Sequence, residues 1–265
     1  MRVYNDELYH YGVLGMKWGH HKAKSNVKFY RESSNKIIKN KDGSETIPAG
    51  FEFNRVGKHS LDVNKSGGLY VSYGKEDAAR YIKALGPTPI SKLLGNASEA
   101  VQHIKVKSDI KMPSDSEVAN QTAKLLLSNP KLLKTFNESL YSFAVTGDFN
   151  KDIDRKDLEK AIKNPSGKEG QKLSYGVSSI LGDETYKNEA RDLYSHFKNQ
   201  GYDAIPDVHD RLSGTSKSAM IILNPEKVEI TSTTTITKDV MKSAKDYVKA
   251  YNKKYGKLKP SEIIQ

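Results

Sequence analysis

The fold is decided by residues 67–81, Gly67-Gly-Leu-Tyr-Val-Ser-Tyr-Gly-Lys-Glu-Asp-Ala-Ala-Arg-Tyr81. A pair of glycines leads into residues 69–72, an aliphatic and aromatic run that is typical of a strand. Residues 75–85 are good helix formers, with acids in the first turn and a glycine and a proline directly after the end. The stretch therefore predicts a strand, a turn and a helix, with Tyr70 on the strand and Tyr81 in the helix.

Elements on either side of this stretch indicate an α+β fold. Alternating side chains predict strands, the turn Lys41-Asp-Gly43 predicts a hairpin, and a capping pair, Ser114 and Glu117, opens a series of helices. Strands are predicted at 50–56, 69–72, 101–107, 202–205, 219–223 and 228–231, and helices at 75–85, 114–127, 130–145, 155–163, 171–181 and 184–199. The order is strands, helices, strands, which predicts a helical insertion at about residues 114–199 rather than a doubly wound sheet.

Composition excludes several classes of site. The 265 residues include no cysteine, which excludes disulfides, thiol catalysis and cysteine-based metal centres. No apolar run approaches the roughly 20 residues of a membrane-spanning helix, so we expect no membrane partner. The first residues lack the basic-then-apolar order of a secretory signal, so we expect a cytosolic product of one or two domains.

Positive charge gathers at the two ends of the chain. The net charge is +11, of which residues 1–31 carry +4 and residues 238–265 carry +5. A nearly neutral body with two basic ends suggests that the ends meet a polyanion, most simply DNA. The alternative is a pair of solubilising tails, because lysine dominates and no sequence-reading module is visible.

The C-terminal stretch has the pattern of an amphipathic helix. Between residues 238 and 255, apolar and aromatic side chains recur on one face and lysines lie elsewhere on the helical wheel. We expect the apolar face to pack on the body, with a partner helix or the polyanion as alternatives. The chain then divides into an N-terminal segment, 1–28, a folded domain, 29–237, and a basic C-terminal helix, 238–265.

The strand, turn and helix of residues 67–81 resemble the central motif of ADP-ribosyltransferases. In the poly-ADP-ribose polymerase branch, a Gly-x-Gly-[IL]-Tyr-Phe strand precedes a helix ending in Tyr, and two tyrosines flank nicotinamide. Tyr70 and Tyr81 have the same spacing, eleven residues. The resemblance implies split antiparallel sheets and NAD as the cofactor, bound by Tyr70, Ser72 and Tyr81. Aromatic faces suit the flat nicotinamide ring and a hydroxyl suits its carboxamide; the alternative is that both tyrosines simply pack in the core.

The family's first motif fixes the dinucleotide with an Arg or His on an upstream strand. Phe51-Glu-Phe-Asn-Arg55 resembles that strand, so Arg55 is the candidate for a bidentate phosphate contact. The Tyr30-Arg31 pair is a rival, because the toxin-like branch of the family begins with Tyr-Arg.

The family's third motif is incomplete. Transferases place a Glu near the start of a late strand, where it stabilises the positively charged transition state. The corresponding strand here, residues 218–225, begins without an acid, and the nearest upstream acids are Asp207 and Asp210. The candidate catalytic residues are therefore Arg55, Asp207 and Asp210. We expect weak or absent catalysis, because Asp reaches less far than Glu.

A second resemblance lies near the start of the chain. The segment His10-Tyr-Gly-Val-Leu-Gly-Met-Lys-Trp-Gly19 is similar to one in head and portal-region proteins of tailed phages. Residues 202–225 also look like the end of transferase-like domains in phage minor head proteins. These resemblances imply a phage virion protein, made in the host bacterial cytoplasm, that docks on head or portal proteins through Tyr9 to Gly19.

Residues 148–159 match a calcium-binding EF-hand loop at positions 1, 3, 5, 7 and 12. Ile153 stands where the sharp turn of such a loop requires glycine. The alternative is an ordinary helix start, with acids near the positive end of the helix dipole. The histidines lack metal-ligand spacing, so we expect no metal site.

Three functions are compatible with these observations. The first is a virion-associated protein, a minor capsid or head-packaged component with a weakly active or inactive transferase-like domain. The second is an active NAD-dependent transferase, delivered with the genome to modify host proteins. The third is a nucleotide-binding anti-defence protein, which predicts absence from virions.

Replacing Trp18 tests the docking segment. Large aromatic anchors dominate interfaces, so Trp18→Ala should exclude the protein from phage particles while leaving its melting temperature nearly unchanged. The measurement is mass spectrometry of purified particles beside thermal unfolding of the free protein. Normal packaging of the variant would refute the docking role, and an unfolded variant would place Trp18 in the core instead.

Overall fold

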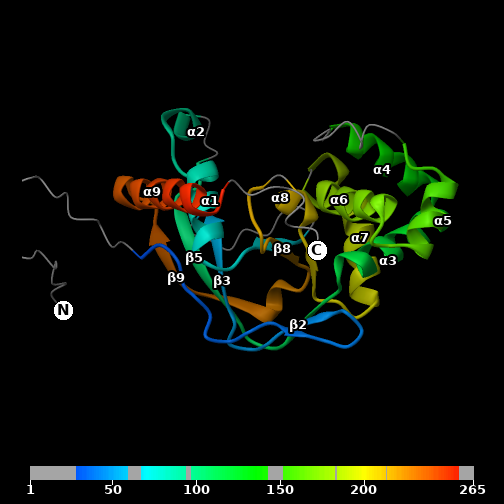
Figure 1. Ribbon diagram of the computed structural model, residues 1–265, viewed down its shortest axis with the longest axis horizontal. Coiled ribbons are helices and arrows are strands. Elements are labelled where there is room, and N and C mark those ends of the chain that lie inside the picture. Colours follow the sequence, from blue (N-terminus) through cyan, green and yellow to red (C-terminus); the bar gives the residue numbers. More distant parts are fainter. Residues whose placement is uncertain are drawn as a thin grey trace, which may run out of the picture.

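The computed structural model describes residues 28–58, 67–93, 97–142, 152–182, 184–212 and 214–256. Figure 1 shows two parts side by side: small sheets topped by helices α1 and α9, and a group of helices containing α3 to α7. This is the α+β architecture that the order of elements predicts. The proposed docking segment, Tyr9 to Gly19, lies outside the described residues, as do residues 148–151 of the calcium-like loop.

The β part consists of antiparallel sheets of short strands. Among the described residues there are three such sheets, with strand orders β1-β2-β6, β3-β5-β9 and β4-β8-β7. Their bounds are β1 (Ile38–Lys39), β2 (Glu45–Ile47), β3 (Glu52–Gly57), β4 (Leu69–Val71), β5 (Ala100–Val106), β6 (Ile110–Met112), β7 (Ala204–Pro206), β8 (Met220–Ile222) and β9 (Val228–Thr235). Apolar residues between the sheets, such as Phe53, Leu69, Ile104 and Ile222, are fully buried and form a common core.

The sheets containing β3 and β4 touch at one backbone bridge, between Asn54 and Ser72. The N–H of Asn54 donates to the carbonyl of Ser72 at 2.7 Å, and the reciprocal bond is 3.1 Å. The buried side chain of Asn54 binds the incoming chain as well, accepting from the N–H of Arg31 at 2.8 Å and donating to its carbonyl at 2.9 Å. Asn54 therefore joins two sheets and fixes where residue 31 runs.

Between β6 and β7 the described chain is helical. The helices are α3 (Asp115–Ser128), α4 (Pro130–Ser142), α5 (Arg155–Lys163), α6 (Lys168–Gly182), the 3₁₀ turn η2 (Glu184–Tyr186) and α7 (Lys187–Asn199). Their inward faces, including Phe136, Leu158, Leu173 and Phe197, form a separate core. The chain between β6 and β7 is thus helical, as the order of elements predicts, and the core of these helices also takes in Ile205 and Ile221 from the strands.

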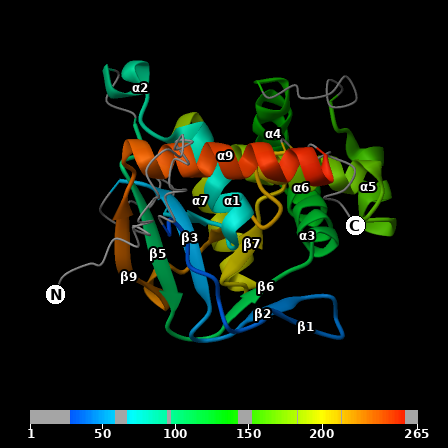
Figure 2. The ribbon, with the colours of Figure 1, turned by 60° about the vertical axis from the view of Figure 1, so that its left-hand side comes forward.

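Helix α9 (Lys238–Tyr255) packs on α1 (Lys75–Leu85), and Figure 2 shows it lying across that helix. Val240, Ala244 and Val248 of α9 are buried with Ala79 and Ile82 of α1. The apolar stripe predicted between residues 238 and 255 thus covers the body. The remaining elements are α2 (Pro89–Leu93), α8 (Val208–Leu212) and the 3₁₀ turn η3 (Pro225–Lys227).

Local capping explains where two helices begin. The Ser114 hydroxyl accepts from the N–H of Glu117 at 3.2 Å, which starts α3 where the sequence predicts it. Asp154 and Asp157 form a reciprocal capping box at the start of α5. Asp154, which would be the seventh position of a calcium loop, is thus occupied as a helix cap, while Glu159 bonds Arg155 at 3.1 Å.

One buried carboxylate ties α1 to the start of β8. Asp77 is 2 % exposed and accepts from the hydroxyls of Ser216 and Ser218, each at 2.5 Å. It also accepts from the backbone N–H of Lys217 at 3.1 Å and of Ser218 at 2.8 Å. The Ser218 hydroxyl in turn accepts from the N–H of Tyr73 at 2.9 Å, in the turn before α1. The turn, the helix and the late strand are therefore held at one point.

Removing this carboxylate should destabilise the whole fold. Asp77→Ala leaves buried hydroxyl and amide donors without an acceptor, so we expect the free energy of unfolding to fall by about 3 kcal/mol or more. Urea unfolding of the variant and the wild type measures the loss. Asp192→Ala, at an exposed position of α7, is the matched control and should change stability by less than about 0.5 kcal/mol. Equal stabilities for the two variants would contradict the anchoring role.

Candidate functional site

A cavity of about 190 Å³ opens where α1, β3, β4 and α8 meet. Apart from the rival Arg31, the residues predicted for the nucleotide site all line it: Arg55, Tyr70, Ser72, Tyr81, Asp207 and Asp210. Asn54, Val56, Val71 and Leu85 complete the lining. Residues separated by more than 150 positions are thus brought together in one place.

The bridge between Asn54 and Ser72 brings β3 and β4 together to form one wall of the cavity. Side chains two apart on a strand share a face, and Tyr70 and Ser72 both line the cavity. The Ser72 hydroxyl donates to the carbonyl of Asn54 at 3.4 Å. Arg55 follows Asn54 on β3 and donates from Nη1 to the Oε1 of Gln102 at 3.0 Å. The cavity therefore has a cation, an aromatic ring and a hydroxyl on one wall.

The opposite wall is acidic. Asp207 is 2 % exposed, and its carboxylate accepts from the N–H of Asp210 at 3.2 Å, which caps the short helix α8. Asp210 accepts a hydrogen bond from the hydroxyl of Tyr81 at 2.5 Å, and its other oxygen lies 3.4 Å from Nδ1 of His209. Asp207 thus has a structural role as a helix cap, besides facing the cavity.

Burial and mutual repulsion set the protonation of this wall. Burial, together with the nearby charge of Asp210, raises the pKa of Asp207 to about 7. Burial and the same carboxylate raise the pKa of Tyr81 well above 10, so its hydroxyl stays protonated and donates. The hydrogen bond to Asp210 raises the pKa of His209. A carboxyl whose pKa is raised towards neutral pH and which lines a cavity is a candidate general acid or base.

The structure separates the two arginines that the sequence left as rivals. Arg31 lies outside this cavity, beside Glu52 at 3.4 Å, and it lines a different surface hollow with Tyr30 and His103. Its place follows from the two bonds between its backbone and Asn54. Arg55 is therefore the arginine that faces Tyr70 and Tyr81.

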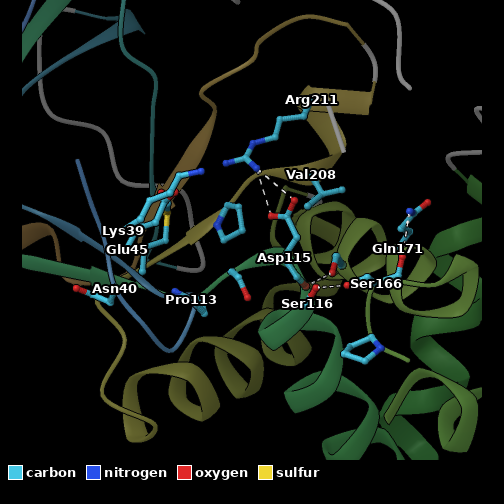
Figure 3. A pocket seen from close by; sticks show the side chains of 16 residues that line it. Lys39, Asn40, Glu45, Pro113, Asp115, Ser116, Ser166, Gln171, Val208 and Arg211 are labelled. Atoms are coloured by element: carbon cyan, nitrogen blue, oxygen red, sulfur yellow. Dashed lines mark hydrogen bonds and ion pairs between the residues drawn. The ribbon is translucent and has the colours of Figure 1, made fainter. Parts of the chain in front are cut away.

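A second cavity, of about 540 Å³, lies between the β1–β2 hairpin, the start of α3, the start of α6 and α8 (Figure 3). Its polar groups largely bind one another. Nη1 of Arg211 bonds both oxygens of Asp115 at 3.2 and 3.4 Å, and the hydroxyls of Ser116 and Ser166 are 2.7 Å apart. These contacts hold α8 against α3. Because Asp210 belongs to the same helix, they also fix one wall of the first cavity.

The residues that hold the site together were not predicted from the sequence. Asp77 was an ordinary first-turn acid of a helix, and its partners at 216–218 lie about 140 residues further along. Arg211 and Asp115 are 96 residues apart. No local pattern marks either pairing. Within the described part of the chain, no group of three or more His, Asp or Glu side chains is arranged to hold a metal ion.

A protein-family model described as "Family of unknown function (DUF7211)" matches residues 1–25. The match includes the Gly-Met-Lys-Trp-Gly run but stops before the first described residue. No curated protein and no solved structure matches the chain. Among the described residues, no helix is both long and apolar enough to span a membrane.

The raised pKa of Asp207 predicts how stability depends on pH. Its pKa rises from an ordinary 3.8 to about 7 on folding, so the folded protein holds a proton that the unfolded chain releases. Stability should fall as the pH rises from 5 to 8. Asp207→Asn keeps a cap acceptor but cannot ionise, so it should remove on the order of 2–3 kcal/mol of that decline.

Urea unfolding at pH 5 and pH 8 measures this difference. The pKa of His209 is also raised in the folded protein, so His209 too makes stability fall as the pH rises. Asp207→Asn should therefore retain part of the decline in stability. Asp192→Asn, at an exposed position, serves as the control and should decline as steeply as the wild type. An unchanged decline in Asp207→Asn would show that Asp207 is already ionised at pH 5.

Proposed function

We propose that the chain is a phage virion-associated protein whose folded domain is ADP-ribosyltransferase-like and binds NAD with slow or absent turnover. One observation carries the nucleotide part of the proposal. Arg55, Tyr70, Ser72 and Tyr81, chosen for their places in the family's motifs, line a single cavity together with two carboxylates.

In this proposal the cavity receives the nicotinamide end of NAD. The rings of Tyr70 and Tyr81 contact the flat nicotinamide, and the Ser72 hydroxyl bonds its carboxamide. Arg55, which lines the same cavity, bonds a phosphate. The cavity's volume of about 190 Å³ is below the roughly 300–1,000 Å³ of pockets that enclose a whole drug-sized ligand. The adenosine end would therefore lie outside it.

Slow turnover follows from the protonation and the hydrogen bonds of Asp207 and Asp210. Breaking the bond between ribose and nicotinamide builds up positive charge, which an ionised carboxylate stabilises and a neutral one does not. Burial shifts Asp207 towards its neutral form, and Asp207 is also bound as a helix cap. Asp210 already accepts from Tyr81 and lies against His209. Neither acid is therefore placed as freely as a dedicated catalytic Glu.

The virion part of the proposal depends on the N-terminal segment. The run from Gly15 to Gly19 and the resemblance of residues 202–225 to minor head proteins support a place in the phage head. Two other functions share the same cavity: an active transferase delivered to the host, and an anti-defence protein that binds nucleotides in the host cytoplasm. Mass spectrometry of purified particles distinguishes the anti-defence protein, which would be absent from them, from the virion protein and the delivered transferase. Nicotinamide release distinguishes the active transferase from the other two.

The nucleotide site is tested by thermal unfolding with NAD. At tenfold above its Kd, NAD should raise the melting temperature by about 3–6 °C, because mass action then adds about 1.4 kcal/mol of stability. Arg55→Ala and Tyr70→Ala should each reduce this shift. Arg31→Ala is the matched control, because Arg31 lies outside the cavity, and it should keep the full shift.

The same proteins are assayed for nicotinamide release by chromatography. We expect little or none from the wild type, and any release should disappear in Asp207→Asn and Asp210→Asn. Rapid NAD hydrolysis by the wild type would favour the active transferase over our proposal. A wild type whose melting is indifferent to NAD would remove the nucleotide site altogether.

A further inference from the structure

Helix α9 has two opposite faces with different chemistry. Its inner face, with Val240, Ala244 and Val248, is buried against α1. Its outer side carries lysines, and every one of them is exposed: Lys238, Lys242, Lys245, Lys249, Lys253 and Lys254. Figure 2 shows the helix at the surface of the molecule along its whole length.

Five of these lysines form one line, which we call the lysine stripe: Lys238, Lys242, Lys245, Lys249 and Lys253. Their spacings of three and four residues keep them within a sector of about 80° around the helix axis. At 1.5 Å per residue, the stripe is about 22 Å long. It therefore presents five charges at intervals of about 5–6 Å on the side away from α1.

These charges are not neutralised by the rest of the described chain. None of the five amines forms an ion pair with a described residue, although Asp239 and Asp246 lie on the same helix. Like charges three or four residues apart on a helix repel one another. A linear polyanion laid along the stripe would relieve that repulsion and release its own counterions.

We infer that the lysine stripe of α9 binds the phosphate backbone of double-stranded DNA without reading its sequence. Lysine is a point charge that contacts phosphates, whereas base recognition depends on forked or amide side chains such as Arg, Asn and Gln. Residues 238–255 contain no Arg or Gln, and their one amide, Asn252, binds Arg80 at 3.0 Å. The stripe therefore has charge without base-reading groups.

The aromatic residues of α9 argue for a duplex rather than a single strand. Single-strand binding relies on free aromatic rings on which bases stack. Here Lys75 lies 4.6 Å from the ring centre of Tyr247, and Arg80 and Lys217 lie 5.7 and 5.5 Å from that of Tyr251. These cations attach Tyr247 and Tyr251 to the body. Tyr255 is 60 % exposed, but one ring at the end of the helix does not provide a row on which successive bases stack.

The packing of α9 also disfavours a lipid surface as the partner. A helix that binds at a membrane surface buries its apolar face among the lipids. In α9 that face is already covered, because Val240, Ala244 and Val248 are at most 3 % exposed. An anionic membrane could contact only the lysines, and no apolar face of α9 would be left to bury among the lipids.

Salt-dependent DNA binding by the full chain tests the inference. Fluorescence anisotropy with a labelled 30-base-pair duplex gives Kd at several salt concentrations for the wild type and for K242Q/K245Q/K249Q. If each lysine neutralises one phosphate, the slope of log K against log salt should fall in magnitude by nearly three, and Kd at low salt should rise about tenfold or more. K242R/K245R/K249R keeps the charges and should bind as the wild type does.

K124Q/K131Q/K198Q is the matched control, because it removes the same charge from exposed positions on α3, α4 and α7. It should keep the wild-type slope. An equal loss in this control would show that net charge alone governs binding. An unchanged slope in the α9 variant would assign binding to another segment, such as residues 1–31.

Two further measurements complete the test. Melting temperatures of all variants should agree within a few degrees, because the substituted lysines are exposed. Binding to phosphatidylglycerol vesicles should be weak, and binding to a single strand of the same length should be no tighter than to the duplex. Tight, stripe-dependent vesicle binding, or a clear preference for the single strand, would overturn the inference.

Discussion

The carboxylate of Asp77 is the interaction on which the arrangement of the candidate site depends. It lies in the first turn of α1 and accepts hydrogen bonds from three consecutive residues, 216–218, at the start of β8. Because β8 pairs with both β4 and β7, the same link sets the position of Tyr70 on β4 and of Asp207 directly after β7. A buried charge is tolerated when its hydrogen bonds are made, and here the charge and its donors hold α1 and the late strand at a fixed distance. Tyr81, one turn further along α1, is thereby held against Asp210.

The hydrogen bonds of Asp77 affect where the chain could hold the catalytic acid that the transferase resemblance would require. In that family a Glu stands near the start of the late strand, and here Ser218 occupies that region, with its hydroxyl donating to Asp77 and accepting from the N–H of Tyr73. An acid at Ser218 would set two buried carboxylates against each other, which costs several kcal/mol unless one takes up a proton. The acids that reach the cavity come from α8 instead, where Asp207 and Asp210 already repel one another. The hydrogen bonds of Asp77 therefore occupy the start of β8, and a catalytic acid placed there would disrupt them.

Local chemistry made much of the fold predictable from the sequence. The bounds of α1 follow from Gly74 before it and Gly86 after it, and the start of α5 follows from the capping box of Asp154 and Asp157. Tyr70 and Ser72 share a face because side chains alternate on a strand. The sheet β1-β2-β6 is different, because strands of two and three residues are too short to show a period, so β6 was not predicted. The choice between Arg31 and Arg55 was beyond the sequence too, since it depends on Asn54 binding the backbone of residue 31. What the sequence could not supply were contacts between residues far apart in the chain.

Helix α1 connects the two surfaces for which functions are proposed, and it also keeps them apart. One of its faces, with Ala78, Ala79 and Ile82, is buried under α9, while Tyr81 and Leu85 line the cavity. The lysine stripe lies on the far side of α9, so the width of α9 itself, about 10 Å, separates its charges from α1. That is about one Debye length at physiological salt, and the charges would act on Asp207 only weakly. Occupying one surface should therefore change the affinity of the other little, unless α9 itself moves on α1. The buried contacts of Val240, Ala244 and Val248 oppose such a movement, because separating the helices would expose those side chains to water.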